Sequence, residues 1–328
     1  MHLIPLGPAG RSTTQLGFGC SSLMGANGRR ASLAMLEAAF DAGIRHFDVA
    51  PMYGYGQAES CLGEFLKRHR GAATVTTKYG IPPARNQSLL GAARRIAGPV
   101  VKLLPGLKSR LSKAAGAIAH NDARATFTAT QARESLDRSL GELGVDRIDV
   151  WLLHEVTADE LRDDALLRFL EDSVTAGTLG AFGVGSDRSK LDALLATRSA
   201  FCRALQFEWS VFDPDPPQAG TLRIQHRALT ENFRTLHAAL LGDRPARLRW
   251  SSQTGADLAD PAVLASLMLR ASIDVNPQGI VLFSSKSPQH IQQNIRVAED
   301  DALAGPARQL RLLAHSEGSA FLKLACKV

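Results

Sequence analysis

The chain has 328 residues, of which 45% are hydrophobic, and a formal net charge of +6. This length is ordinary for one large α/β domain, and no long uncharged apolar run indicates a signal peptide, a membrane span or stable membrane association. The four cysteines, Cys20, Cys61, Cys202 and Cys326, lack C-x-x-C spacing, so we expect free thiols in the cytoplasm rather than a disulfide or zinc framework.

The excess of positive over negative charge comes from one segment of the chain. Between Phe65 and Asn121 there are eleven Lys or Arg residues and no Asp or Glu. Removing these eleven from the total of 38 leaves 27 basic residues against 32 acidic ones, a balance of −5. This distribution argues against a general nucleic-acid-binding surface, and we expect no nucleic acid partner.

Short apolar or β-branched runs alternate along the chain with longer segments of helical periodicity. The predicted strands are Thr14–Cys20, Ile44–Ala50, Thr74–Lys78, Ile148–His154, Ala181–Gly185, Ala204–Trp209, Thr221–Arg227 and Ile280–Ser284. The predicted helices are Ser32–Asp41, Glu59–His69, Thr130–Leu143, Ala158–Ala176, Lys190–Thr197, Glu231–Leu241 with Pro261–Ile273, and Pro288–Ala298.

This alternation is typical of strand–helix units joined by right-handed crossovers, which produce a parallel sheet. Eight strands of this kind favour a closed (β/α)8 barrel, or TIM barrel, over a doubly wound sheet. No G-x-G-x-x-G follows the first strand, which weakens the doubly wound alternative. The sequence therefore predicts one α/β domain, a single barrel over residues 1–328.

Two connections depart from the regular alternation. Only residues 210–220, with three prolines, separate the sixth and seventh strands, so we expect the helix after strand six to be shortened or missing. Residues 81–128 form a long insertion after the third strand. Its segment Arg85–Lys113 mixes apolar residues with Arg94, Arg95, Lys102, Lys108, Arg110 and Lys113.

Three interpretations of this basic insertion stay open. It could be a lid over the barrel mouth that attracts an anionic substrate. It could instead lie on an anionic membrane surface, or be a decorated loop with neither role.

Ionisable side chains stand at or just after three consecutive predicted strands: Asp48 and Tyr53, then Lys78, then His154. Alone, a strand-end Asp caps a helix about half the time, a Lys is usually solvated and a His is more often a packed or capping residue, but together they lie where a barrel does its chemistry. An ammonium lowers the pKa of a nearby phenol, ordinarily about 10, and a carboxylate keeps that ammonium charged. With an imidazole to bind the substrate oxygen, such a set would donate a proton as a carbonyl is reduced, and the hydride would come from a cofactor.

The segments FDVAPMYGYGQAESCLG, TTKYG, SLGELGVDRIDVWLLH and LFSSKSPQHIQQN, in this order, resemble the aldo-keto reductase family. The resemblance runs from about Leu16 to Ala298 and implies a (β/α)8 barrel that reduces carbonyls with NADPH. It implies that Tyr53 is the general acid, that Lys78 lowers the pKa of Tyr53 and that Asp48 pairs with Lys78. It also implies that His154 orients the carbonyl oxygen.

The resemblance also implies a cofactor site, with NADPH favoured over NADH. Lys286 beside a helix N-terminus suits a 2′-phosphate, although His290 stands where the family often has an arginine. His226 stands where the family has an aromatic residue that stacks on nicotinamide, or it is a loop histidine without cofactor contact. Gln206 would bind the carboxamide. The expected cofactor-binding residues are Ser186, Asp187, Gln206, His226, Ser284, Ser285, Lys286, His290, Gln293 and Asn294.

Three function classes follow. The leading one is an NADPH-dependent oxidoreductase whose partner is a small aldehyde, ketone or sugar, with the reverse dehydrogenase reaction included. The second is a cofactor-binding regulatory or scaffold subunit on the same fold, with little turnover. The third is a metal-dependent lyase or hydrolase using His46, Asp48 and His154, but no H-x-H or H-E-x-x-H pattern supports it, so we expect no metal.

Overall fold

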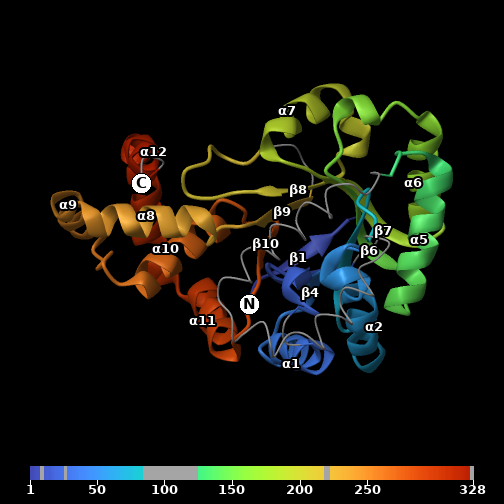
Figure 1. The fold of residues 1–328 in the computed structure, drawn as a ribbon, viewed down its shortest axis with the longest axis horizontal. Coiled ribbons are helices and arrows are strands. Elements are labelled where there is room, and N and C mark those ends of the chain that lie inside the picture. Colours follow the sequence, from blue (N-terminus) through green and yellow to red (C-terminus); the bar gives the residue numbers. More distant parts are fainter. Residues whose placement is uncertain (8–10, 26–27, 84–124, 218–221, 326–328) are drawn as a thin grey trace, which may run out of the picture.

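The computed structural model describes residues 1–7, 11–25, 28–83, 125–217 and 222–325, which form a closed eight-stranded barrel surrounded by helices (Figure 1). Around the barrel the strand order is β10, β3, β4, β5, β6, β7, β8 and β9, and every neighbouring pair is parallel. The predicted (β/α)8 fold is thereby confirmed. The barrel strands are β3 (Leu16–Gly19), β4 (His46–Asp48), β5 (Thr74–Tyr79), β6 (Ile148–His154), β7 (Leu179–Gly185), β8 (Ala204–Glu208), β9 (Leu222–His226) and β10 (Ile280–Phe283).

Helices form the outer layer of the barrel. In Figure 1, α8, α9 and α12 group at the left of the view, whereas α5 and α6 lie on the opposite side of the barrel. Several helices begin at an Asp, Ser or Thr whose side chain accepts a hydrogen bond from the first turn. The helices are α1 (Gly28–Asp41), α2 (Ala58–Arg68), α5 (Ala129–Leu143), α6 (Asp164–Thr175), α7 (Arg188–Thr197), α8 (Glu231–Gly242), α9 (Arg244–Thr254), α10 (Pro261–Asp274), α11 (Pro288–Glu299) and α12 (Ala304–Ala325).

The predicted helix Ala158–Ala176 is wrong in its first part. A 3-10 turn, η3 (Ala158–Glu160), comes first, and α6 begins only at Asp164. Asp163 causes the break because its side chain accepts a hydrogen bond from the Ala165 amide at 2.8 Å, which makes it an N-cap. Helices α9 and α12 and an N-terminal hairpin of β1 (Leu3–Leu6) and β2 (Arg11–Thr14) were not among the predicted elements.

The two irregular connections have different outcomes. Between β8 and β9 the described residues, 209–217, contain no helix, in agreement with the prediction that the sixth helix is shortened or missing. Most of the predicted insertion, including every basic residue of Arg85–Lys113, lies outside the described residues.

Two further expectations concern the cysteines and the helices. Cys20, Cys61 and Cys202 are buried free thiols, as predicted, and Cys326 lies outside the described residues. In the described part of the chain, no helix has both the length and the apolar character that crossing a membrane requires.

Side chains alternate between the barrel interior and the helix layer because successive strand residues face opposite sides. Val150 and Leu152 of β6 belong to a small interior core that Ile4 and Leu6 of the hairpin close from one end. The intervening Trp151 belongs to the larger core between strands and helices. Interior positions above the small core are therefore left for polar side chains at the carboxyl ends of the strands.

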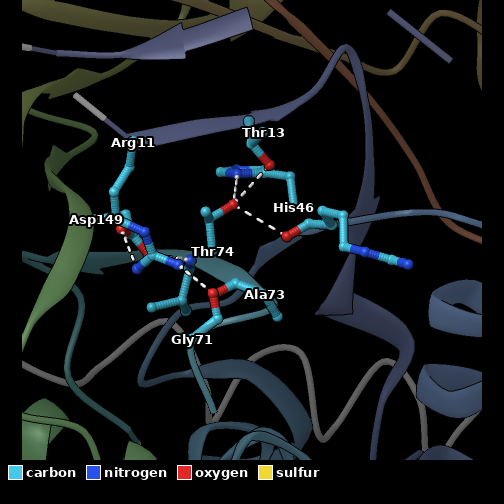
Figure 2. Close-up of polar contacts among 9 residues, drawn as sticks. Arg11, Thr13, His46, Gly71, Ala73, Thr74 and Asp149 are labelled. Carbon is cyan, nitrogen blue, oxygen red and sulfur yellow. Dashed lines mark hydrogen bonds and ion pairs between the residues drawn. The ribbon is translucent and has the colours of Figure 1, made fainter. Parts of the chain in front are cut away.

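Figure 2 shows how the hairpin is fastened to the amino end of the barrel. Arg11 Nη1 donates to Asp149 Oδ1 at 2.8 Å, and Nη2 donates to the carbonyls of Gly71 and Ala73, each at 3.1 Å. The second oxygen of Asp149 accepts a hydrogen bond from the Val75 amide at 2.8 Å. Asp149 is only 2% exposed, so its charge depends on these donors.

Replacing Arg11 with methionine should destabilise the protein through Asp149. The buried carboxylate would lose its ion-pair partner, and we expect the free energy of unfolding to fall by about 1–3 kcal/mol in urea titrations. Arg68→Met is the matched control because it removes an ion pair with Glu37 whose partners are both more exposed than Asp149. That change should cost less than about 1 kcal/mol. Equal losses in the two variants would contradict the importance of Asp149 burial.

Candidate active site

Strand ends place the ionisable residues at one end of the barrel. Asp48 is the last residue of β4, Lys78 is the penultimate residue of β5, and His154 is the last residue of β6. The register pairs Asp48 with Thr76 and Lys78 with Leu152, so the three strands end at a similar height. By alternation, all three site residues share the interior side with Thr76 and Leu152.

Lys78 lies at the centre of this site. Its Nζ donates to Asp48 Oδ1 at 2.6 Å and to the Val49 carbonyl at 3.2 Å. The same nitrogen lies 5.3 Å from the centroid of the Tyr53 ring. Lys78 is 1% exposed and Asp48 is 3% exposed, so a buried ion pair stands beside a phenol. The structure thus brings Asp48, Tyr53 and Lys78 together.

A Gly-rich turn delivers Tyr53 to this position. Tyr53 begins the 3-10 segment η2 (Tyr53–Gly56), in which Gly54 and Tyr55 have φ of 59° and 58°. A Cβ on Gly54 would lie 2.7 Å from Met24 Cβ and 2.8 Å from the Leu23 carbonyl oxygen. Only glycine therefore fits at the second position of YGYG, which explains the loop composition beside the site.

The pKa of Tyr53 differs from the sequence-based expectation. Lys78 is the largest single influence and lowers the pKa of the phenol, but burial and the charge of Asp48 together outweigh it. The net result is a raised pKa for Tyr53, so the expectation of a net lowered pKa is wrong. For Lys78, burial lowers the pKa, but Asp48 and Tyr53 raise it by more, and the ammonium remains charged.

Gln206 on β8 is directly connected to this ion pair. Its Nε2 donates to Asp48 Oδ2 at 2.6 Å, and its side chain is buried. Lys78 and Gln206 therefore hold the two oxygens of Asp48 from different strands. The role expected for Gln206, binding of the nicotinamide carboxamide, did not include this link, since no local signal joins residues 48 and 206.

Two histidines end strands at the same face. His154 ends β6 opposite Gly185 of β7, and His226 ends β9 opposite Glu208 of β8. Burial, with smaller effects from Lys78 and Arg227, lowers the pKa of His226 to about 3. The imidazole of His226 is therefore neutral. By alternation His226 shares the interior side of β9 with Ile224, so it faces the same mouth.

Three further cofactor candidates line the ends of β7 and β10. Ser186 Oγ donates to the Val156 carbonyl at 2.7 Å, and Asp187 forms a 3.4 Å ion pair with Lys190 at the start of α7. Ser284 Oγ donates to the Gly19 carbonyl at 2.7 Å, which ties β10 to β3. These hydroxyls retain lone pairs and can still accept hydrogen bonds from a ligand.

The other cofactor candidates gather at the start of α11. Ser287 caps the helix by accepting a hydrogen bond from the His290 amide at 3.4 Å, and Ser285 Oγ donates to the Ser287 carbonyl at 3.0 Å. Lys286 and His290 are exposed, and Gln293 and Asn294 are partly exposed on the same helix. An open helix N-terminus beside a lysine fits a phosphate group. Ser287 was not among the predicted site residues, although Ser-Pro before a helical pattern is an N-cap signal.

The metal interpretation conflicts with the contacts of its predicted ligands. His46 Nδ1 and Nε2 each lie 3.1 Å from a threonine hydroxyl, those of Thr74 and Thr76. Figure 2 shows His46 beside Thr74 in the barrel interior. Asp48 is engaged by Lys78 and Gln206, and within the described residues no group of three or more His, Cys, Asp or Glu could hold a metal ion.

Comparison with known proteins places this geometry in a family. The Aldo/keto reductase family model matches residues 15–241. Pyridoxal 4-dehydrogenase of Microbacterium luteolum is 28% identical over 323 residues, covering 88% of this chain and 91% of that protein. D-threo-aldose 1-dehydrogenase of a Pseudomonas species is 33% identical over 186 residues, covering 54% of this chain and 51% of that protein.

Solved structures of the same family have a similar fold. The holo form of an aldo-keto reductase from Bacillus halodurans superimposes with a TM-score of 0.66 at 17% sequence identity, covering 94% of this chain and 96% of that one. With a family match that spans seven of the eight barrel strands and the Asp48–Lys78 pair, this chain belongs to the aldo/keto reductase family and is an NAD(P)H-dependent oxidoreductase that acts on carbonyl or alcohol groups.

Proposed function

We propose that this protein reduces a small carbonyl compound to an alcohol with NADPH, and that Tyr53 is the general acid. The observation that carries the proposal is the position of Lys78 Nζ, 2.6 Å from Asp48 and 5.3 Å from the Tyr53 ring centroid, at the carboxyl end of a closed barrel. This arrangement can transfer a proton to an oxygen that gains negative charge.

Each residue of the set has a separate task. A nicotinamide cofactor, when bound, supplies the hydride. Tyr53 gives its phenolic proton to the substrate oxygen, and the Lys78 ammonium stabilises the phenolate that remains. Asp48 keeps Lys78 charged and in place. His154 orients the substrate oxygen by hydrogen bonding.

The raised pKa of Tyr53 is compatible with this role. A phenol whose pKa lies above its ordinary value of about 10 keeps its proton at neutral pH and is ready to donate it. Lys78 acts on the product of the transfer, because its charge stabilises phenolate more than phenol. Proton donation therefore becomes more favourable, because Lys78 lowers the free energy of the phenolate relative to that of the phenol.

We propose a hydroxylated carbonyl compound as the substrate. Charged residues border the strand ends at the mouth, among them Asp187 and Arg227, so a polar substrate has hydrogen-bonding partners there. Relatives named for D-threo-aldose and for pyridoxal support this class. Turnover of glyceraldehyde, pyridoxal and an aromatic ketone tests it, and a clear preference for the aromatic ketone would contradict it.

Replacing Lys286 with alanine should weaken NADPH more than NADH. We propose that Lys286 and the N-terminus of α11 hold the 2′-phosphate, which NADH lacks. The Kd for NADPH should rise about tenfold, as expected for one lost charge-assisted hydrogen bond, while the Kd for NADH changes less than about twofold. Nicotinamide fluorescence titrations measure both constants.

Arg296→Ala is the matched control because Arg296 is an exposed cation in the last turn of the same helix. It should leave both constants unchanged. If Lys286→Ala weakened NADPH and NADH equally, the phosphate site would have to lie elsewhere.

A further inference from the structure

The residue that follows His154 has an uncommon backbone conformation. Glu155 has φ of 56°, in the left-handed region that residues other than Gly, Asn and Asp rarely adopt. Among the described residues, the other non-glycine residues with positive φ are Met24, Tyr55 and Arg227. Strained conformations of this kind persist only where the surroundings enforce them, and they concentrate at functional sites.

Two backbone contacts fix the chain around Glu155. The Glu155 amide donates to the Gly185 carbonyl at 2.6 Å, and the next carbonyl, that of Val156, accepts the 2.7 Å hydrogen bond from Ser186 Oγ. The chain leaving β6 is therefore held against the end of β7. With the Glu155 amide held at Gly185, the φ of Glu155 sets the direction of the chain that follows, including the Val156 carbonyl that Ser186 contacts.

The Glu155 side chain is held as well. Lys190 Nζ, on the first turn of α7, lies 3.0 Å from Glu155 Oε2 and 3.4 Å from Asp187 Oδ2. Lys190 and Glu155 are 31% and 35% exposed, so the pair is only partly screened by water. One ammonium thus connects the residue after His154 with the cofactor candidate Asp187.

The other strand-end histidine has the same arrangement. Arg227 follows His226, has φ of 66°, and forms a 2.7 Å ion pair with Glu208 of the neighbouring strand. In both places a charged residue turns the chain immediately after an imidazole and is held by an ion pair. The repetition argues against a chance conformation at Glu155.

We infer that Glu155 and Lys190 are positioning residues for His154: their ion pair holds the left-handed turn that directs the imidazole toward the substrate oxygen. Neither residue needs to touch the reacting atoms. A small displacement of an orienting group lowers the rate because the reacting geometry is lost. This inference rests on the role proposed for His154.

Substitutions at Glu155 separate backbone conformation from charge. Glu155→Ala loses the ion pair and keeps a Cβ that disfavours positive φ, so we expect kcat to fall about tenfold. Glu155→Gly also loses the ion pair but adopts positive φ freely, so kcat should stay within about threefold of the unmodified protein. Lys190→Met should lower kcat by about threefold, the size of a partly exposed ion pair. The Kd for NADPH should stay unchanged in both Glu155 variants.

The controls distinguish this inference from the proposed function. Glu171→Ala removes an ion pair with Arg203 of comparable exposure on the outer surface and should not change kcat. His154→Ala should lower kcat by at least about a hundredfold. If His154→Ala acts so and Glu155→Ala keeps full kcat, or if Gly and Ala at 155 are equally slow, only the positioning role is overturned. If His154→Ala keeps full kcat, the proposed role of His154 and this inference both fail.

Discussion

Replacing Tyr53 with phenylalanine should lower kcat for carbonyl reduction by about 10²–10⁴-fold, the usual contribution of a general acid. The substitution removes only the hydroxyl, so the ring beside Lys78 remains and the Kd for NADPH should not change. Steady-state kinetics on the carbonyl panel and nicotinamide fluorescence measure the two effects separately. Because the pKa of Tyr53 is raised, reduction by the unmodified protein should not decline between about pH 7 and pH 9 through loss of this proton.

Tyr79→Phe is the matched control for this prediction. Tyr79 ends β5 one residue after Lys78, faces the outer core, and donates its hydroxyl to the Thr126 carbonyl at 2.5 Å. Its loss should reduce stability without reducing kcat. Full turnover by Tyr53→Phe would remove the proposed acid, and intact cofactor binding without turnover in the unmodified protein would favour a regulatory subunit.

Replacing Lys78 with methionine should affect stability and activity together. Asp48 would be left as a buried carboxylate without its cation, which typically costs about 3–5 kcal/mol of unfolding free energy. The kcat should also fall by about 10²–10⁴-fold, because phenolate at Tyr53 loses its stabilising charge. Urea unfolding and steady-state kinetics measure the two quantities.

A second substitution separates these two effects. In Asp48→Asn/Lys78→Met the uncompensated charge is gone, so much of the lost stability should return while turnover stays low. In the unmodified protein the Lys78 ammonium should stay charged up to at least about pH 10, since the pKa of Lys78 is raised above its ordinary value. A double variant as unstable as Lys78→Met would indicate that packing around residue 78, rather than charge, sets the loss.

Local patterns were sufficient for the barrel. Each strand–helix unit has its own apolar run and periodicity, so the order of the elements can be predicted without knowledge of their contacts. The hairpin and the start of α6 were not predicted correctly, because their local sequence patterns are weak or interrupted. The hairpin strands Leu3–Leu6 and Arg11–Thr14 are short and mixed in polarity, and Asp163 interrupts a helical pattern by capping the second half.

The amino-acid sequence by itself determined the fold class and placed Asp48, Lys78 and His154 at strand ends, because strand periodicity and strand boundaries are local properties. Only the tertiary structure decided the net pKa of Tyr53 and the link between Gln206 and Asp48, two residues 158 positions apart. It also decided the left-handed turn at Glu155. Burial, charge separation and enforced backbone geometry arise from contacts between distant segments, and no local pattern records them.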